Sequence, residues 1–118
     1  MSEKKIERKI AVIFAADVVG YSKHMKNAEV NTLKSFKSCK KILDRLFEEH
    51  GGLIFNTAGD SILAEFSSAV SAVVCASEFQ KLIKERNSSG DAEVQMEFRI
   101  GIIWEMLLRN LAIYMGME

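Results

Sequence analysis

The stretch from Ile10 to Ser22, IAVIFAADVVGYS, places one carboxylate, Asp17, in an otherwise apolar run that also contains Gly20. Apolar and β-branched residues in such a run predict a strand that is buried on both faces. A buried carboxylate is costly unless it has a partner, a metal ion or an exit to water. Asp17 is therefore a candidate functional residue, and the alternative is an aspartate that caps the turn after the strand.

Helical spacing predicts two helices in the middle of the chain. The first runs from about Ala28 to His50 and ends at Gly51-Gly52. The second starts at a cap, Ser67 or Ser68, and continues to about Glu85. Each has one apolar stripe that predicts a buried face. The stripes consist of Val30, Leu33, Phe36, Cys39, Leu43, Leu46 and Phe47 in the first helix and Ala69, Ala72, Val73, Ala76, Phe79 and Ile83 in the second.

The remaining apolar segments predict three more strands. Leu53 to Phe55 and Ile62 to Phe66 flank a polar segment, so they predict a hairpin whose turn uses Gly59. Strict alternation from Glu93 to Ile102 predicts the last strand. The order is then strand, helix, strand, strand, helix, strand. It predicts an α+β fold of the ferredoxin-like, split βαβ type (β-α-β-β-α-β), with both helices on one face of an antiparallel sheet.

This topology brings together two aspartates that are distant in the sequence. With right-handed crossovers, the first and third strands are antiparallel neighbours, so the end of the first lies beside the start of the third. Asp17 and Asp60 should therefore meet at one edge of the sheet. Two carboxylates about 4 Å apart repel by about 4 kcal/mol at an effective dielectric of about 20, so a fold that keeps both ionised usually keeps them for a cation. The alternative is a pair of turn-capping aspartates that point apart.

Two carboxylates of this kind suit Mg²⁺ or Mn²⁺, which bind a few protein oxygens and take their other ligands from phosphate and water. Gly20 allows the chain to approach a ligand closely. A triphosphate tail would lie near a run of backbone N–H groups, those of Val18, Val19, Gly20 and Tyr21. The chemistry predicted for this arrangement is two-metal phosphoryl or nucleotidyl transfer.

Three motifs together resemble the class III adenylate/guanylate cyclase catalytic domain, in the form common in bacteria: FAADVVGYS, then EEHGGLIFNTAGDSILAEF, then FRIGI after a further helix. The resemblance covers roughly Arg8 to Ile102. It implies that two metal ions are held by Asp17, Asp60 and the carbonyl of Val18. It implies phosphate binding by the amides of Val19, Gly20 and Tyr21. It also implies a dimer, either a homodimer or a heterodimer with another cyclase chain, that converts ATP or GTP to a cyclic nucleotide and pyrophosphate.

The sequence departs from the family pattern at two places. The family's adenine-selecting Lys would precede Thr57, where this chain has Asn56, so the choice between ATP and GTP is open. After Ile102 the family would continue with a second base-contacting segment and then an Asn and an Arg that stabilise the transition state. This chain instead continues IWEMLLRNLAIYMGME. We therefore expect it to keep only the metal and phosphate half of the site, with no transition-state residue, and to be close to inactive as a homodimer.

The departure after Ile102 can be examined through the genetic code. Codons that encode Ile103 to Leu107 can be read one base out of phase, with one A restored, as Asn-Met-Gly-Asp-Val, which resembles the family's usual continuation. The hypothesis is that one base was lost near the codon for Ile103, so that residues 103–118 are out of frame. The alternative is a genuine short amphipathic helix, which the spacing of Trp104, Leu107, Leu108, Leu111 and Tyr114 would permit.

Composition excludes several other classes of protein. Sixteen basic residues balance sixteen acidic ones among 118, so no basic excess indicates nucleic acid or a membrane surface as a partner. Cys39 and Cys75 lack metal-ligand spacing and predict reduced thiols in a cytoplasmic protein. No apolar stretch predicts a membrane segment. We expect a charged lead-in (residues 1–8), a partial cyclase domain (residues 9–102) and the out-of-frame tail (residues 103–118).

Two other functional classes stay open at this point. One is a non-catalytic ferredoxin-like module that binds nucleotide or a partner chain without turnover. The other is a structural fragment that aggregates through Trp104 to Met115. A mixed dimer with an intact cyclase chain could in turn restore one site, with Asp17 and Asp60 from this chain and the missing groups from the partner.

Overall fold

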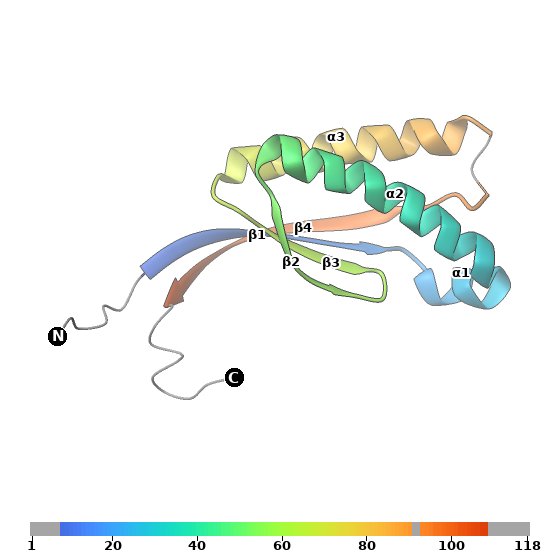
Figure 1. The fold of residues 1–118 in the computed structure, drawn as a ribbon, viewed down its shortest axis with the longest axis horizontal. Coiled ribbons are helices and arrows are strands. Elements are labelled where there is room, and N and C mark those ends of the chain that lie inside the picture. The colour runs from blue at the N-terminus through green and yellow to red at the C-terminus, as the bar shows by residue number, and fades with distance from the viewer. Residues whose placement is uncertain (1–7, 91–92, 109–118) are drawn as a thin grey trace.

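The computed structural model describes residues 8–90 and 93–108, which form one four-stranded antiparallel sheet with helices on one face (Figure 1). The strands are β1 (Arg8–Val18), β2 (Leu53–Ala58), β3 (Ser61–Phe66) and β4 (Phe98–Leu108). The helices are α1 (Tyr21–Asn27), α2 (Glu29–His50) and α3 (Ala69–Ser88). The strands are ordered β2-β3-β1-β4 across the sheet. This confirms the predicted ferredoxin-like α+β fold, to which α1 is an unpredicted addition.

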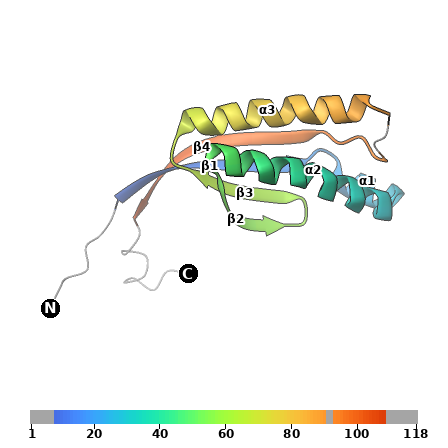
Figure 2. The ribbon, with the colours of Figure 1, turned by 45° about the horizontal axis from the view of Figure 1, so that its top comes forward.

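The hydrophobic core lies between the sheet and the long helices α2 and α3, which run side by side above it (Figures 1 and 2). Phe14 of β1 is fully buried at its centre. Its ring lies 5.0 Å from that of Phe47, edge to face, and 5.8 Å from that of Phe66. Aromatic pairs at these distances add to the stabilisation that burial of their area provides. The buried side chains of β1 on this face are Val12, Phe14, Ala16 and Val18.

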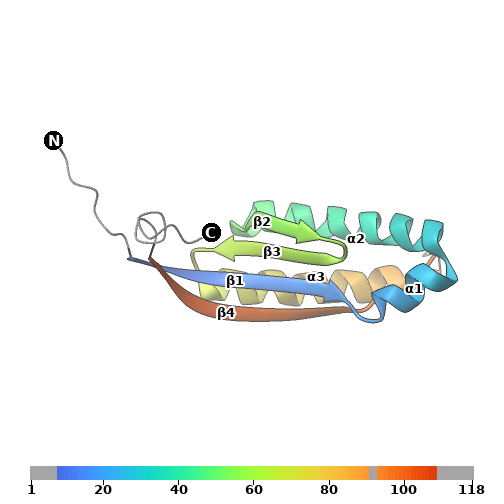
Figure 3. The same cartoon turned by 90° about the horizontal axis from the view of Figure 1, so that it is seen from below.

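The opposite face of the sheet is not covered by any element that the structure describes (Figure 3). Ile13, Ala15 and Asp17 of β1 point to this face and are half-buried. The prediction that β1 is buried on both faces is therefore wrong. Its apolar residues alternate between a helix-covered face and an open face, and an apolar run does not distinguish these two cases.

Helix α2 ends as predicted, because Gly51 has φ 83° and the following N–H of Gly52 bonds to Phe47 O. The predicted stripe is wrong in its first turns, where Val30 and Leu33 are exposed. Thr32 and Ser35 are buried instead, and both have polar partners. Thr32 Oγ1 donates to the carbonyl of His24 at 3.0 Å, and Ser35 Oγ accepts from Val94 N at 3.0 Å.

The hairpin between β2 and β3 is tighter than predicted. Its strands extend to Ala58 and from Ser61, so that only Gly59 and Asp60 form the turn. Gly59 has φ 60°, a backbone conformation that favours glycine. Asn56, which was expected in the polar segment between the strands, lies within β2, next to an irregularity in the pairing with β3.

Helix α3 begins at the predicted cap, since Ser68 Oγ accepts from Ser71 N at 3.2 Å. Strand β4 begins at Phe98 rather than Glu93. The side chain of Asn87 forms hydrogen bonds with both backbone groups of Met96. Nδ2 donates to the carbonyl at 2.8 Å, and Oδ1 accepts from the amide at 3.2 Å. These bonds replace strand pairing, so the segment before Phe98 lies against α3 instead of extending the sheet.

At its other end β4 continues past the predicted limit, Ile102, to Leu108, and pairs with β1 as far as Arg8. The helical alternative for the tail is therefore wrong for residues 103–108, where Ile103 and Trp104 are exposed. The tail's residues 109–118 and the lead-in's residues 1–7 lie outside the described residues. Within the described ranges, no helix has both the length and the apolar character needed to cross a membrane.

Candidate functional site

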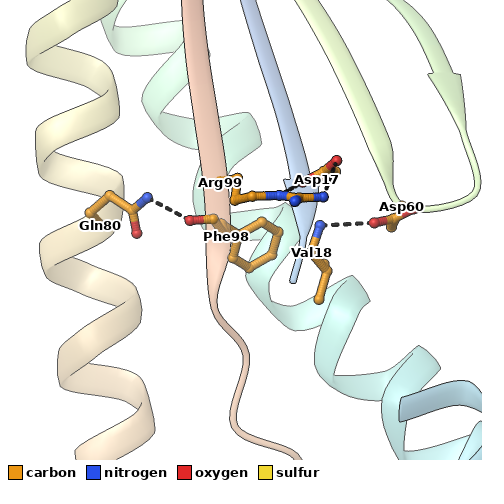
Figure 4. Close-up of polar contacts among 6 residues, drawn as sticks. All are labelled: Asp17, Val18, Asp60, Gln80, Phe98 and Arg99. Atoms are coloured by element: carbon orange, nitrogen blue, oxygen red, sulfur yellow. Dashed lines mark hydrogen bonds and ion pairs between the residues drawn. The ribbon is translucent and has the colours of Figure 1, made fainter. Parts of the chain in front are cut away.

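Asp17 and Asp60 lie at the same end of the sheet. Asp17 is the second-last residue of β1, and Asp60 is in the turn before β3. Because β1 and β3 pair antiparallel, with Ala16 opposite Ile62, the turn that precedes β3 lies beside the end of β1. Asp60 Oδ2 accepts a hydrogen bond of 2.8 Å from the amide of Val18 (Figure 4). The structure thus brings the two aspartates to one end of the sheet, as the predicted topology requires, and Val18 and Asp60 are 42 positions apart in the sequence.

Arg99 is part of this site, and the sequence analysis did not predict it. It lies opposite Asp17 in the pairing of β1 with β4. Its guanidinium donates from Nε to Asp17 Oδ1 at 2.9 Å and from a terminal nitrogen to Oδ2 at 3.0 Å (Figure 4). The hydrogen bond to Asp17 and the charge of Asp17 raise the pKa of Arg99 above its ordinary value, and the charge of Asp60 adds to this. The alternation of β4 places Arg99 on the outward face, but its partner depends on the strand register.

Of the backbone amides that follow Asp17, some already donate hydrogen bonds within the chain and some are free to bind a ligand. The amide of Val18 donates to Asp60, and that of Val19 donates to the carbonyl of Glu97 at 2.8 Å. Gly20 has φ 67° and is the N-cap of α1, whose first internal bond runs from His24 N to Gly20 O at 3.0 Å. The amides of Gly20 and Tyr21 precede that bond and have no hydrogen-bond partner in the described part of the chain. Of the three amides predicted to bind phosphate, only that of Val19 already donates to a backbone carbonyl in the described part of the chain.

A shallow depression of about 390 Å³ lies beside Asp17 on the open face, with Ser61, Leu63, Arg99 and Gly101 among its lining residues. Asn56, the predicted base-specificity position, belongs to the same face. Residues that are paired directly across strands point to the same side of a sheet. One such row crosses all four strands through Asn56, Leu63, Ala15 and Gly101. The adjacent row on this face contains Asp17 and Arg99, so the side chains of Asn56 and Asp17 lie on the same face of the sheet.

No protein-family model matches the chain. "Putative adenylate cyclase 3" of Rhizobium meliloti (strain 1021) is 36% identical over 103 residues, which are 86% of this chain and 18% of that protein. The crystal structure of an adenylate/guanylate cyclase/hydrolase from Silicibacter pomeroyi is 33% identical with a TM-score of 0.75, and the match covers 87% of this chain and 62% of that one. This chain belongs to the class III nucleotide cyclase family. The fold of the guanylyl cyclase Cya2 matches with a TM-score of 0.74 at 23% identity, over 87% of this chain and 57% of that chain.

The cyclase domain described here thus spans less than a fifth of the curated relative and about three-fifths of the solved cyclase chains. Divalent metal use is a general property of this family.

The oxygen atoms at the end of β1 fit a hard divalent cation. No group of three or more His, Cys, Asp or Glu side chains suited to a metal ion occurs in residues 8–90 and 93–108. Two carboxylates and a carbonyl instead match the sites of Mg²⁺ or Mn²⁺, which keep water and phosphate as ligands. Asp60 Oδ1 has no partner in the described part of the chain, whereas both carboxylate oxygens of Asp17 contact Arg99.

Proposed function

We propose that this chain contributes the metal- and phosphate-binding half of a nucleotide cyclase site, which acts on ATP or GTP and gives a cyclic nucleotide and pyrophosphate. The observation that carries the proposal is the contact between Asp60 and the end of β1, which holds a second carboxylate beside Asp17. Asp17 and Asp60 are two acidic side chains at one end of the sheet, and Arg99 pairs with Asp17 alone among the described residues, so a further cation would balance the remaining carboxylate.

In this proposal the ligands of two Mg²⁺ or Mn²⁺ ions include Asp17, Asp60 and the carbonyl of Val18. When bound, such ions neutralise phosphate charge and orient the reacting oxygens. The hydrogen bond from Val18 N orients the Asp60 carboxylate and leaves Oδ1 directed away from that contact. The half-exposed position of both aspartates leaves room for water and substrate oxygens to complete the coordination.

The phosphates of the nucleotide would lie against the amides of Gly20 and Tyr21. The Tyr21 ring packs on Phe36 at 6.0 Å between centroids, which fixes the first turn of α1 relative to α2. Gly20 has no side chain and a left-handed backbone, and a Cβ at this position would meet no atom within 4 Å. The backbone can therefore approach a phosphate closely here.

The base would lie toward Asn56 on the same open face. An amide side chain both donates and accepts hydrogen bonds, so Asn56 can pair with adenine or with guanine. We propose a purine nucleoside triphosphate as the substrate class, which the likeness to adenylate and guanylate cyclases supports, with the choice between ATP and GTP left to competition binding.

The metal half is tested by Mn²⁺-dependent binding of fluorescent ATP and GTP analogues to the full 118-residue chain. Asp17→Asn and Asp60→Asn keep the side-chain size, and the amide oxygen of the second variant can still accept from Val18 N. Removing a group that only orients a metal ligand costs about 10–100-fold in affinity, so removing a ligand charge should weaken binding at least about tenfold. Asp44→Asn is the matched control, because the Asp44 side chain bonds to Lys40 on α2, away from the site.

Equal nucleotide binding by all four proteins would contradict the metal role of Asp17 and Asp60. Metal-dependent binding that is lost in both site variants, without any cyclic product, would leave the chain as a nucleotide-binding module. Product should appear when the chain is mixed with a cyclase chain that keeps its transition-state residues but has its own metal-binding aspartates replaced, because each site in this family is shared between two chains. Failure of the mixture to form product would contradict the mixed-dimer proposal alone.

For the tail we propose that residues 103–118 are out of frame with the cyclase domain. The exposure of Trp104, which leaves 67% of its surface in solvent, supports this proposal, because tryptophan is highly buried on average in folded domains. The nucleotide sequence from the codon for Phe98 onward tests it. A shifted frame that continues the family pattern is expected, and a shifted frame without that pattern would mean that the tail is native.

A further inference from the structure

The ion pair between Arg99 and Asp17 occupies the carboxylate that the proposed function assigns to a metal. Both oxygens of Asp17 accept from the same guanidinium, at 2.9 and 3.0 Å. The two residues are 82 positions apart in the sequence, and the register of β4 on β1 places them directly opposite each other. Figure 4 shows the guanidinium lying across the end of β1 toward the Asp17 carboxylate.

A divalent cation and this guanidinium cannot use Asp17 in the same way at the same time. A metal ion needs at least one of the oxygens that Arg99 now contacts, and it repels the positive charge of Arg99 at short range. Asp60 makes no hydrogen bond with the guanidinium in the described part of the chain, although its charge contributes to the raised pKa of Arg99. Arg99 therefore stays protonated and acts as a fixed positive charge beside Asp17 at any ordinary pH.

The ion pair is also easy to open. The side chain of Arg99 is 70% exposed and that of Asp17 is 36% exposed, so water can replace each partner. Exposed ion pairs contribute little to stability because solvent screens them. Within the described residues, Arg99 makes no side-chain hydrogen bond to any residue except Asp17.

We propose that Arg99 is a displaceable counter-ion, which occupies Asp17 in the metal-free chain and must leave it before a divalent cation can bind. This inference rests on the proposed function of Asp17 as a metal ligand. Arg99 lowers the affinity for metal, since part of the binding free energy is used to open the pair. It also keeps Asp17 neutralised, and so keeps Asp17 and Asp60 from repelling each other, when no metal is present.

The test is Mn²⁺ binding, measured by electron paramagnetic resonance of free Mn²⁺ without nucleotide. Arg99→Lys is the decisive variant, because lysine keeps the charge but cannot form the two parallel bonds of a guanidinium. Exposed pairs are worth about 0.2–1 kcal/mol, so Arg99→Lys should bind Mn²⁺ more tightly than the natural chain, by up to about fivefold. Arg99→Ala should bind at least as tightly as Arg99→Lys. Arg45→Ala, which changes an exposed arginine on α2, should leave the affinity unchanged.

Two results would overturn this inference while the proposed function stands. One is Mn²⁺ binding that depends on Asp17 but is equal in the natural chain and in Arg99→Lys, with only Arg99→Ala tighter, because simple charge repulsion then explains the effect. The other is weaker binding in both Arg99 variants. Failure of the natural chain to bind Mn²⁺ at all would overturn the inference and the proposed function together.

A second measurement uses the natural chain and does not depend on the folding of any variant. The Nε–H group of Arg99 gives a separate signal in a nitrogen-15 NMR spectrum when it is held in a hydrogen bond. Adding Mg²⁺, which is diamagnetic, should move or remove this signal as the guanidinium leaves Asp17. A signal that stays in place while the Asp17 and Asp60 amide signals shift would show that metal binds without displacing Arg99.

Discussion

The two faces of the sheet differ in what they demand of their residues. On the helix-covered face, Phe14 is surrounded by the rings of Phe47 and Phe66 and has no contact with solvent. On the open face, Asp17 is half-exposed and paired with Arg99. It points to the same side of β1 as Ile13 and Ala15. Alternate positions of one strand thus face the hydrophobic core and the proposed site. The strand's apolar alternation supports the core, and the open face is where substitutions can alter binding without unfolding the chain.

The largest expected effect separates the two faces at adjacent positions. Phe14→Ala removes a buried ring and leaves a cavity, which typically costs about 3–5 kcal/mol of the free energy of unfolding. Ile13→Ala on the open face should cost less than half as much, because Ile13 is only half-buried. Urea denaturation measures both values. Similar losses at the two positions would mean that the open face is covered in solution.

Two glycines provide the next comparison. A Cβ at Gly52 would lie 2.6 Å from Phe66 Cζ and 2.8 Å from Phe47 Cδ1, whereas a Cβ at Gly101 would meet no atom within 4 Å. Gly52→Ala should therefore overpack the covered face and lower the free energy of unfolding by about 1–3 kcal/mol. Gly101→Ala is the matched control on the open face and should change stability by less than about 0.5 kcal/mol. The midpoint of urea unfolding distinguishes the two.

The pH dependence of the free energy of unfolding reports whether Cys75 is buried on the covered face. Cys75 is buried on α3, and desolvation, helped by the charges of Glu78 and Glu49, raises its pKa from 9.0 to about 11. Between these values the unfolded chain loses the thiol proton and the folded chain keeps it, so stability falls as the pH rises through this window. Cys75→Ala should make the free energy of unfolding less dependent on pH between 9.0 and about 11. An unchanged slope would place the thiol in contact with water.

The smallest effect on stability is expected at Ile103, on the outer part of β4. Ile103 pairs with Ile13 on the open face and is exposed. Ile103→Ser should change the free energy of unfolding by less than about 0.5 kcal/mol. It should lower light scattering at high protein concentration if exposed apolar residues of this face cause association. Unchanged scattering would argue against association through Ile103, which adjoins the segment from Trp104 to Met115 named in the aggregation hypothesis.

Much of the fold could be predicted because its signals are local. The Gly51-Gly52 stop, the Ser68 cap and the Gly59 turn all lie where sequence patterns indicated them. Helix α1 was missed because it is short and buries no residue, so it has no apolar stripe to find. The start of β4 was misplaced because the Asn87 side chain binds the backbone of Met96, a tertiary contact that overrides the alternation.

The sequence by itself determined the order of the elements and the convergence of Asp17 and Asp60, because right-handed crossovers leave one way to assemble these segments. Only the tertiary structure decided which face of β1 is open, that Val19 donates to Glu97, and that Arg99 lies on Asp17. The physical reason is that local patterns depend on neighbours in the chain, whereas these contacts depend on strand register and on the side to which the helices pack. A shift of one residue in that register would turn Arg99 to the other face of the sheet.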